Sequence, residues 1–261
     1  MKTFNYHSAK DVKEASKLSS SKSAFLAGCM TTIPSMKLGL ANYKDIINIK
    51  GIKKLSGIKV SGKTVTIGST TRHAEVANSK EIKKAIPSLS ALAEGIGDPQ
   101  VRNRGTIGGS IANNDPSADY PSACIALNAL IHTNNRKIDA EIFFRGMFET
   151  ALKKGEIIEA VEFEIPQKSS YQKWPNPASR YAIVGVYVAK HKAGVNVAVT
   201  GAKPCVYNDN NLKGALSKNF SSSAVDNVKI TSSGMNSDIH ASSEYRADMV
   251  KVFAKKAVEA C

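Results

Sequence analysis

The chain has 261 residues, 42% of them hydrophobic, which is enough to fill the core of one large domain or two ordinary ones. Disorder is therefore not expected. Lys and Arg number 36 against 22 Asp and Glu, giving a net charge of +14. Because the lysines are spread along the chain without a long basic block, a lysine-rich solvated surface is favoured over a nucleic-acid-binding face. A contact with an acidic partner subunit stays open.

The four cysteines lie far apart in the sequence, and no histidine stands near them at ligand spacing: Cys29, Cys124, Cys205 and Cys261. This spacing indicates neither a zinc nor an iron–sulfur site. The first ten residues lack the apolar stretch of a signal peptide, and no later run approaches the roughly 18 apolar residues of a membrane span. We expect a cytoplasmic protein with reduced thiols.

Short strands and helices alternate in the first third of the chain. Ser8 and Asp11 have the spacing of a capping box for a helix that reaches about Leu18, and a brief strand runs directly into Gly28. The further elements expected here are a strand at 24–27, a helix at 33–40, a strand at 45–49, a hairpin with arms at 58–60 and 65–67, and helices at about 72–77 and 82–94.

Residues 95–121 are rich in Gly, Asp, Asn, Pro and Ser and indicate an ordered loop of about 27 residues. Beyond it we expect a helix at 122–128, a strand at 161–165, paired strands at 181–189 and 195–200, and a helix at 243–259. Residues 167–178 contain serines and prolines and are expected to join two domains, 1–166 and 179–261.

Two glycine-centred turns carry the chemistry of a phosphate site. At Gly108 and Gly109 the backbone can approach a pyrophosphate closely, because neither residue has a side chain. Thr106 and Ser110 add hydroxyl groups on either side, and Arg102 and Arg104 could balance phosphate charge. Neither turn has the strand, G-x-G-x-x-G, helix order of the dinucleotide fingerprint, so a Rossmann nicotinamide site is disfavoured.

Three ordered motifs resemble the FAD-binding medium subunit of molybdenum hydroxylases of the carbon monoxide dehydrogenase and xanthine dehydrogenase type. They are AGCMTTIP at 27–34, IGDPQVRNRGTIGGS at 96–110 and DPSADYP at 115–121. Further matches at 146–150, 155–158 and 237–246 extend the resemblance over nearly the whole chain. Together they are far more specific than any one glycine turn.

The resemblance implies an α+β fold. A FAD-binding domain of the PCMH type, with subdomains at about 1–55 and 56–166, is followed by a smaller α+β domain at 179–261. It also implies an oxidoreductase subunit of a heterotrimer. FAD here would take electrons from a small 2Fe-2S subunit and pass them to an external acceptor. A large molybdopterin-binding subunit would hydroxylate the substrate, so the molybdenum cofactor and the 2Fe-2S clusters are expected only in partners.

The cofactor-binding residues that the resemblance implies fall into two turns and four single positions. The pyrophosphate cradle consists of Ala27, Gly28, Cys29, Met30 and Thr31 in the first turn and Thr106, Ile107, Gly108, Gly109 and Ser110 in the second. Asp119 matches a position that bonds the hydroxyl groups of the cofactor, Ile158 and Lys173 match positions near the flavin ring, and Tyr171 is a candidate aromatic shield. No catalytic or metal-binding residue is implied.

Cys29 departs from the family pattern, which has a second glycine at this position. If the backbone needs a positive φ there, cysteine costs about 1 kcal/mol and its Cβ crowds the approach of a phosphate. If the backbone is ordinary β, nothing is lost. Both possibilities stay open at the level of sequence.

Other polar residues have structural as well as functional explanations. His73 is a candidate for proton transfer, but a histidine at a helix start with a structural hydrogen bond is favoured. Cys124 lies in an apolar helix and is expected in the core. Asp98 and Asp115 flank prolines and are expected to fix turns. Arg102 and Arg104 could organise the loop or face another subunit instead of contacting FAD.

Two other functions also stay open. One is a free-standing flavoprotein oxidoreductase, which would need its own substrate pocket beside the flavin. The other is a basic assembly or nucleic-acid-binding subunit in which Cys29 has abolished flavin binding.

Overall fold

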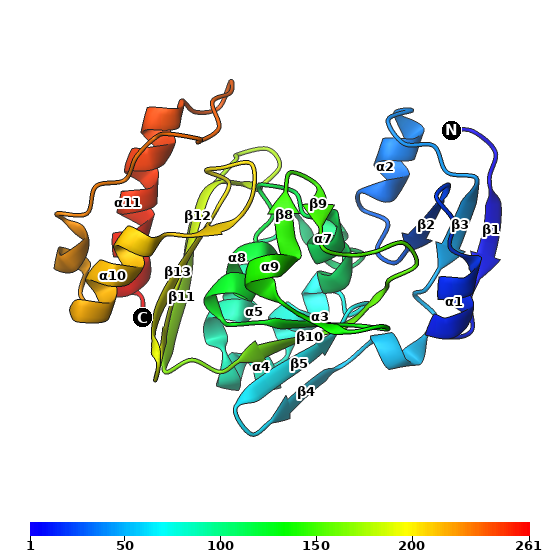
Figure 1. Cartoon of the computed structure of the whole chain (residues 1–261), viewed down its shortest axis with the longest axis horizontal. Helices are drawn as coiled ribbons and strands as arrows, with labels where there is room; N and C mark the ends of the chain where they lie inside the picture. Colours follow the sequence, from blue (N-terminus) through cyan, green and yellow to red (C-terminus); the bar gives the residue numbers. More distant parts are fainter.

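The computed structural model describes residues 1–261 and shows three units along its long axis (Figure 1). The N-terminal unit is a three-stranded parallel sheet in the order β1 (Asn5–Ser8), β3 (Asp45–Asn48), β2 (Ser23–Leu26). Its helices are α1 (Val12–Leu18) and α2 (Thr32–Lys37), and η1 (Lys53–Leu55) leads out of it. A cluster of eight buried apolar residues, one of them Ile157 next to β10 of the central unit, fills its core.

The central unit is an antiparallel five-stranded sheet covered by short helices. Its strands follow the order β4 (Ile58–Ser61), β5 (Thr64–Gly68), β10 (Ile158–Glu164), β6 (Leu130–Thr133), β7 (Lys137–Asp139). Its helices are α3 (His73–Asn78), α4 (Lys80–Ala85), α5 (Pro87–Glu94), α6 (Pro99–Arg102), α7 (Ile107–Asn113), α8 (Tyr120–Ala126) and α9 (Ala140–Phe143). A hairpin of β8 (Phe144–Gly146) and β9 (Glu149–Thr150) projects from it.

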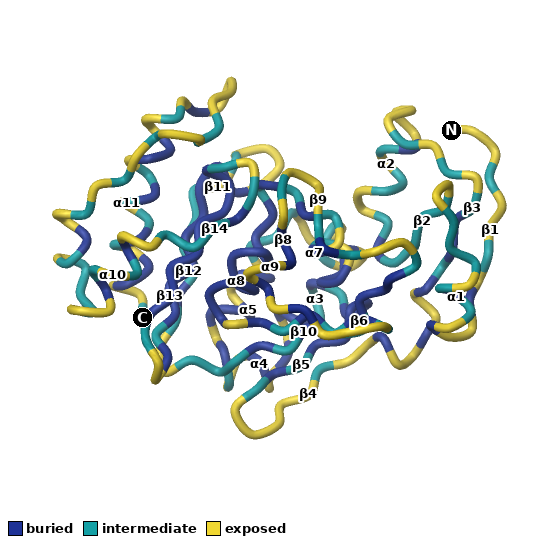
Figure 2. The backbone as a smooth tube through the Cα atoms, in the orientation of Figure 1, coloured by how far each residue is buried: buried dark blue, intermediate teal, exposed yellow.

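The C-terminal unit is a four-stranded antiparallel sheet in the order β11 (Lys168–Pro175), β12 (Ala182–His191), β13 (Gly194–Thr200), β14 (Tyr207–Asn208). One face packs against α10 (Asn210–Lys218), η2 (Ser222–Val225) and α11 (Ser243–Glu259), and the other against α5 and α8. Strand β12 is therefore buried on both faces, with Val186 in the outer core and Tyr187 in the central one. Figure 2 shows this buried middle.

The α+β class is confirmed, and the structure differs from the sequence prediction in three local features. The predicted helix at 82–94 is divided at Ile86, because Pro87 disfavours helical backbone in the residue before it. The predicted loop at 95–121 contains α6, α7 and the first residues of α8. Helix α1 is capped by Asp11, whose carboxylate accepts from the Glu14 amide, while Ser8 ends β1, so the predicted capping box is wrong.

The predicted junction at 167–178 contains β11, which pairs with β12 over its whole length. The division into domains stays a prediction. Cys124 is fully buried, as expected.

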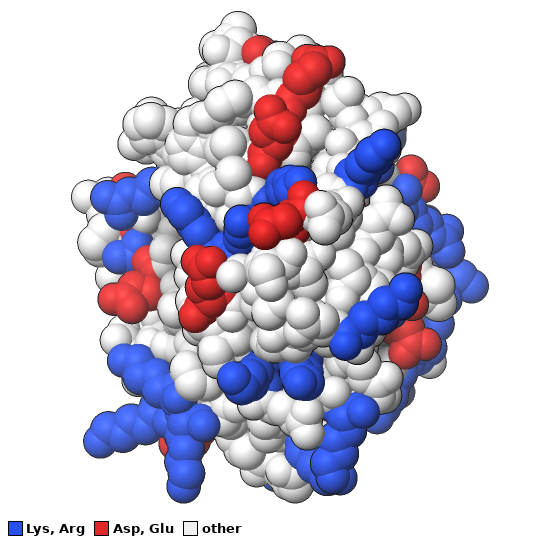
Figure 3. Space-filling view, turned by 90° about the vertical axis from the view of Figure 1, so that its left-hand side faces the viewer, with Lys and Arg blue, Asp and Glu red and all other residues white.

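On the face formed by the C-terminal unit, Lys and Arg side chains form separate groups with Asp and Glu between them (Figure 3). Nowhere does a helix combine the length and apolar character that membrane crossing requires.

Candidate functional site

A cleft of about 830 Å³ is lined by residues of all three units. The N-terminal unit contributes the turn between β2 and α2, and the central unit contributes the start of α7. Residues 177–181, between β11 and β12, line it from the C-terminal unit. The volume lies within the roughly 300–1,000 Å³ of small-molecule sites, and the two sequence-predicted turns face the same space.

The first turn, residues 27–31, presents free backbone donors to the cleft. The N–H groups of Gly28, Cys29, Met30 and Thr31 donate no hydrogen bond within the protein. Backbone N–H groups normally find a partner, because an unpaired one loses the free energy of a hydrogen bond when water is excluded. Successive free N–H groups on a turn form a concavity that binds anions.

Cys29 adopts φ 68°, so the first of the two possibilities left open by the sequence holds. A side chain on a left-handed residue is strained, and glycine is the residue that adopts this conformation freely. The thiol points back along the turn, where Sγ donates to the Ala27 carbonyl at 3.4 Å. The Cys29 side chain lines the cleft, and its backbone strain is about 1 kcal/mol or more.

In the second turn, residues 106–110, the backbone N–H groups of residues 107–110 already donate within the protein. Ile107 N–H donates to the Thr71 carbonyl at 3.1 Å and Gly108 N–H to the Ser69 carbonyl at 2.8 Å. Gly109 N–H donates to Thr106 Oγ1 at 3.2 Å, which caps α7. This turn is thus a rigid wall of the cleft, and the donor it offers to a ligand is the Ser110 hydroxyl, which has no protein partner.

The absence of side chains at three glycines allows the backbone segments around the two turns to pack closely. A Cβ on Gly28 would lie 2.7 Å from Gly105 Cα and would also meet the Arg104 carbonyl. A Cβ on Gly105 would lie 2.6 Å from His73 Nε2, and one on Gly108 would lie 2.5 Å from Ser69 Cβ. Such distances are closer than real Cβ atoms approach. The glycines therefore permit the close contact of two backbones on which the shape of the cleft depends.

Two buried polar atoms beside the second turn have no partner. Ser69 Oγ and His73 Nδ1 make no hydrogen bond, and both residues line the cleft. The favoured structural hydrogen bond of His73 is therefore absent. Burial and the nearby charge of Arg102 lower the pKa of His73 to about 4, so the imidazole is neutral at pH 7. Unpartnered buried polar groups facing a cavity fit a polar ligand.

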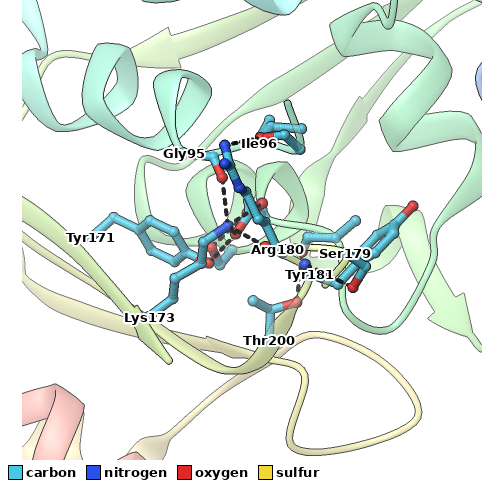
Figure 4. Close-up of polar contacts among 12 residues, drawn as sticks. Gly95, Ile96, Tyr171, Lys173, Ser179, Arg180, Tyr181 and Thr200 are labelled. Carbon is cyan, nitrogen blue, oxygen red and sulfur yellow. Dashed lines mark hydrogen bonds and ion pairs between the residues drawn. The ribbon is translucent and has the colours of Figure 1, made fainter. Parts of the chain in front are cut away.

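Asp119, Tyr171 and Lys173 form one buried polar cluster at the C-terminal side of the cleft. Lys173 Nζ lies 3.0 and 3.1 Å from the two carboxylate oxygens of Asp119 and also donates to the Gly95 and Arg180 carbonyls (Figure 4). The Tyr171 hydroxyl donates to Asp119 as well. Burial raises the pKa of Asp119, and Lys173 and Tyr171 oppose this shift. The cluster joins β11 to the central unit.

Tyr181 lines the cleft, whereas the sequence indicated only the start of a strand at 181–189. It is 43% exposed, and burial together with Asp115 and Asp119 raises its pKa to about 12. In Figure 4 it lies on the far side of Arg180 from Tyr171. The ring of Tyr171 instead stacks on Tyr187, with centroids 5.8 Å apart, so Tyr181 and not Tyr171 is available to a ligand.

Eleven of the fourteen sequence-predicted binding residues line the cleft, and three do not: Ile107, Tyr171 and Lys173. Ile107 is fully buried in the core, and the other two lie behind Asp119. Asp98 and Asp115 accept from backbone N–H groups at 2.8 and 2.9 Å and fix turns, as expected. Arg102 donates to the Ile96 and Gly97 carbonyls and so organises its loop.

Sequence reasoning missed Ser69. It is one residue in the segment between β5 and α3, and no pattern around it distinguishes a ligand contact from a turn. Its position beside Gly108 follows from the crossing of two segments about 40 residues apart in the chain. Only the tertiary structure brings it to the cleft.

Comparison with known proteins identifies relatives over the full chain. Residues 2–168 match the family described as the FAD binding domain in molybdopterin dehydrogenase. The carbon monoxide dehydrogenase medium chain of Hydrogenophaga pseudoflava is 32% identical, and the alignment covers 98% of this chain and 96% of that relative. The glyceraldehyde dehydrogenase medium chain of Sulfolobus acidocaldarius is also 32% identical, over 97% and 96%.

Solved structures agree with the sequence relatives. Carbon monoxide dehydrogenase from Hydrogenophaga pseudoflava superposes with a TM-score of 0.89 at 30% identity, covering 99% of this chain and 97% of that one. The agreement extends over all three units, including the C-terminal unit that lies beyond the family match. The chain therefore belongs to the molybdopterin dehydrogenase family of FAD-binding proteins.

Proposed function

We propose that this chain is the FAD-holding electron-transfer subunit of a molybdenum-containing hydroxylase or dehydrogenase. The observation that carries the proposal is the pairing of two turns across one cleft, with four free N–H groups on the first and a capped, rigid second. A pyrophosphate supplies the acceptors that these N–H groups lack. When bound, FAD supplies the redox chemistry, and the protein supplies binding, orientation and electrostatics.

Each part of the cleft has its own task in this proposal. The first turn donates backbone hydrogen bonds to the pyrophosphate, and Ser110 adds a hydroxyl donor. Asp119 lines the cleft with its charge balanced by Lys173, so its carboxylate can accept from a ribityl or ribose hydroxyl without leaving a charge unpaired. Ile158 and Tyr181 offer apolar surface for ring systems. No residue of the cleft is assigned as a catalytic acid or base.

The proposal includes two partners that the relatives' names suggest. Those relatives are medium chains, which indicates complexes of several subunits. We propose a large subunit with the molybdenum cofactor, a small subunit with 2Fe-2S clusters, and an external electron acceptor. All four cysteines of this chain are free thiols, which fits the proposed cytoplasmic location.

Purification of the chain tests the cofactor directly. We expect a yellow protein that releases FAD, identified by mass, at close to one per chain. Recovery from the native host should add iron and molybdenum in the associated subunits. A lone protein without flavin would contradict the proposal, and full substrate turnover by the isolated chain would favour a free-standing flavoprotein.

A further inference from the structure

The sequence motif at 237–246 contributes no residue to the cleft. It forms the turn before α11 and the first residues of that helix, which lies on the face of the C-terminal sheet turned away from the central unit (Figure 1). A segment that does not line the cleft can influence a ligand there only through the residues it contacts. The contacts of Arg246, a buried charged residue of this motif, show which residues these are.

Arg246 is 2% exposed, and its guanidinium group bonds three partners at once. Nη1 donates to the Ile183 carbonyl at 2.6 Å and to the Gly201 carbonyl at 3.0 Å. Nη2 pairs with Asp238 at 2.6 Å, and the other oxygen of Asp238 accepts from two N–H groups of its own turn at 2.9 and 3.2 Å. The guanidinium therefore ties the start of β12 and the residue after β13 to the turn before α11.

A buried charge is not needed to hold α11 on the sheet. Taking a guanidinium out of water costs free energy, and well-packed apolar residues are often at least as stabilising at such a place. The same helix already packs on the sheet through apolar residues such as Val250 and Ala254. The guanidinium adds fixed geometry, because its planar fork bonds carbonyls and a carboxylate in set directions, which the single ammonium of a lysine does not.

The backbone held by Arg246 is bonded in turn to loop 115–119, which forms part of the cleft. The Gly201 N–H and the Ala182 N–H donate to carbonyls of this loop at 2.8 and 3.2 Å. Asp119 ends the loop and lines the cleft. A short chain of hydrogen bonds thus connects the guanidinium to the backbone that carries the Asp119 carboxylate.

The motif also contacts both ends of the second loop of this wall, residues 177–181. Ile183 follows the loop by two residues, so a bond to its carbonyl fixes the point where the chain returns to the sheet. At the other end, the Asn176 amide lies 3.4 Å from the His240 ring, and the Asn176 N–H donates to the Tyr181 carbonyl at 2.8 Å. These bonds fix the backbone from which the Tyr181 side chain enters the cleft.

We infer that Arg246 and Asp238 are a positioning pair that holds loops 115–119 and 177–181 in the arrangement that binds FAD. The inference rests on the proposed function, because that function supplies FAD as the ligand of the cleft. Neither residue of the pair lines the cleft, so neither is a binding or catalytic residue. Through this pair the C-terminal unit contributes to the affinity of a site whose two glycine turns belong to the other units.

Titration of FAD into the cofactor-free chain, followed by flavin fluorescence, tests the pair. Arg246→Met keeps an aliphatic stem without the guanidinium and should weaken FAD binding by roughly tenfold. Arg246→Lys keeps the charge without the fork and should have an affinity between those of Arg246→Met and the wild type. Val250→Ala is the matched control, because it removes apolar contacts of the same helix and touches neither loop. It should lower the melting temperature and leave the FAD affinity unchanged.

A double-mutant cycle with Tyr181→Ala separates positioning from general stability. In the wild-type background, loss of the ring should weaken FAD binding, because Tyr181 offers surface to a ring system. In the Arg246→Met background the same change should have little further effect, since the loop that carries Tyr181 is already released. Additive losses would overturn the inference, and so would an equal loss of affinity in Val250→Ala at the same drop in melting temperature.

If Arg246→Met does not fold, Asp238→Asn is measured in the same cycle. The Asp238 side chain is 45% exposed, and asparagine keeps an oxygen for the N–H groups of its turn but loses the charge that pairs with Arg246. We expect roughly threefold weaker FAD binding, with little further loss on Tyr181→Ala.

The outcomes also separate this inference from the proposed function. A wild type that binds FAD, with equal affinity in the Asp238→Asn and Arg246→Lys variants, contradicts the positioning pair alone. A wild type that binds no FAD contradicts the proposed function, and the inference fails with it.

Discussion

The two glycine turns face the same cleft but differ in how their backbones are used. Residues 27–31 keep four free N–H groups and include a strained Cys29 in a small unit with an eight-residue core. In the second turn, residues 107–110 donate their N–H groups within the protein, and the turn adjoins a core of 31 residues. Two similar motifs thus have different roles. The first turn can donate to a ligand because its N–H groups have no partner in the protein, whereas the second turn is rigid because its N–H groups are already hydrogen-bonded.

Lowering the pH should reduce the free energy of unfolding, because His73 is buried behind the second turn. The folded pKa of about 4 lies below the usual value of 6.5, so the unfolded chain binds the extra proton first. Stability should be full above pH 6.5 and fall by about 3 kcal/mol as the pH drops towards 4. Urea unfolding across this range should show the slope in the wild type and a shallower slope in His73→Gln, because other groups with lowered pKa values, such as His132 and Glu156, still contribute. The exposed His240→Gln is the control, and an equal slope in both variants would contradict the assignment.

Gly108→Ala should damage the rigid wall. The added Cβ meets Ser69 Cβ at 2.5 Å and the Ser69 carbonyl at 2.7 Å, so the turn must move out of the core. We expect a loss of about 2 kcal/mol in the free energy of unfolding together with weaker FAD binding. Gly214→Ala in α10, where a Cβ meets open space, is the control. Unchanged stability in Gly108→Ala would show that the second turn can accommodate a Cβ at this position and is not rigid.

Gly28→Ala should instead act mainly on the ligand. Its Cβ meets the backbone of Arg104 and Gly105, which separates the turns and misplaces the free donors. We expect at least a tenfold loss of FAD affinity, about 1.4 kcal/mol, with a smaller change in the stability of the FAD-free chain. Fluorescence titration measures the first and thermal melting the second. Gly51→Ala has room for its Cβ and should change neither.

Cys29→Gly should give the smallest change in stability, and this change should be an increase. Removing the side chain relieves φ 68°, for a gain of about 1 kcal/mol, and FAD retention should be equal or better. Cys29→Ala keeps a Cβ and should remain strained, so it separates the thiol from the backbone. A marked loss of flavin in both variants would show that the thiol itself contributes to binding.

Much of the fold followed from local pattern. The hairpin at 58–67 and the helix at 243–259 were predicted from alternation and helical spacing, and β4–β5 and α11 confirm them. Helices α6 and α7 were not predicted, because each is short and depends on a side-chain cap, from Asp98 and Thr106. Their glycine and proline content is typical of loops, and only the cap hydrogen bonds decide otherwise.

The sequence predicted most of the residues that form the site, but not which of their backbone N–H groups are free to bind a ligand. Sequence motifs identified both turns, yet gave both the same task of donating to a pyrophosphate. Whether an N–H group is free depends on carbonyl groups from segments distant in the sequence, here those of Ser69 and Thr71. Tyr181 was overlooked for a similar reason, since its chain neighbours give no indication that the loop returns to the cleft.

Hydrogen exchange of the backbone amides, compared with and without FAD, tests the division between the two turns most directly. Amides 28–31 should exchange rapidly in the FAD-free chain and become protected when FAD binds, whereas amides 107–110 should be protected in both states. If amides 28–31 stay exposed in the FAD-bound chain while amides 107–110 gain protection, the first turn is not the donor and the account is wrong.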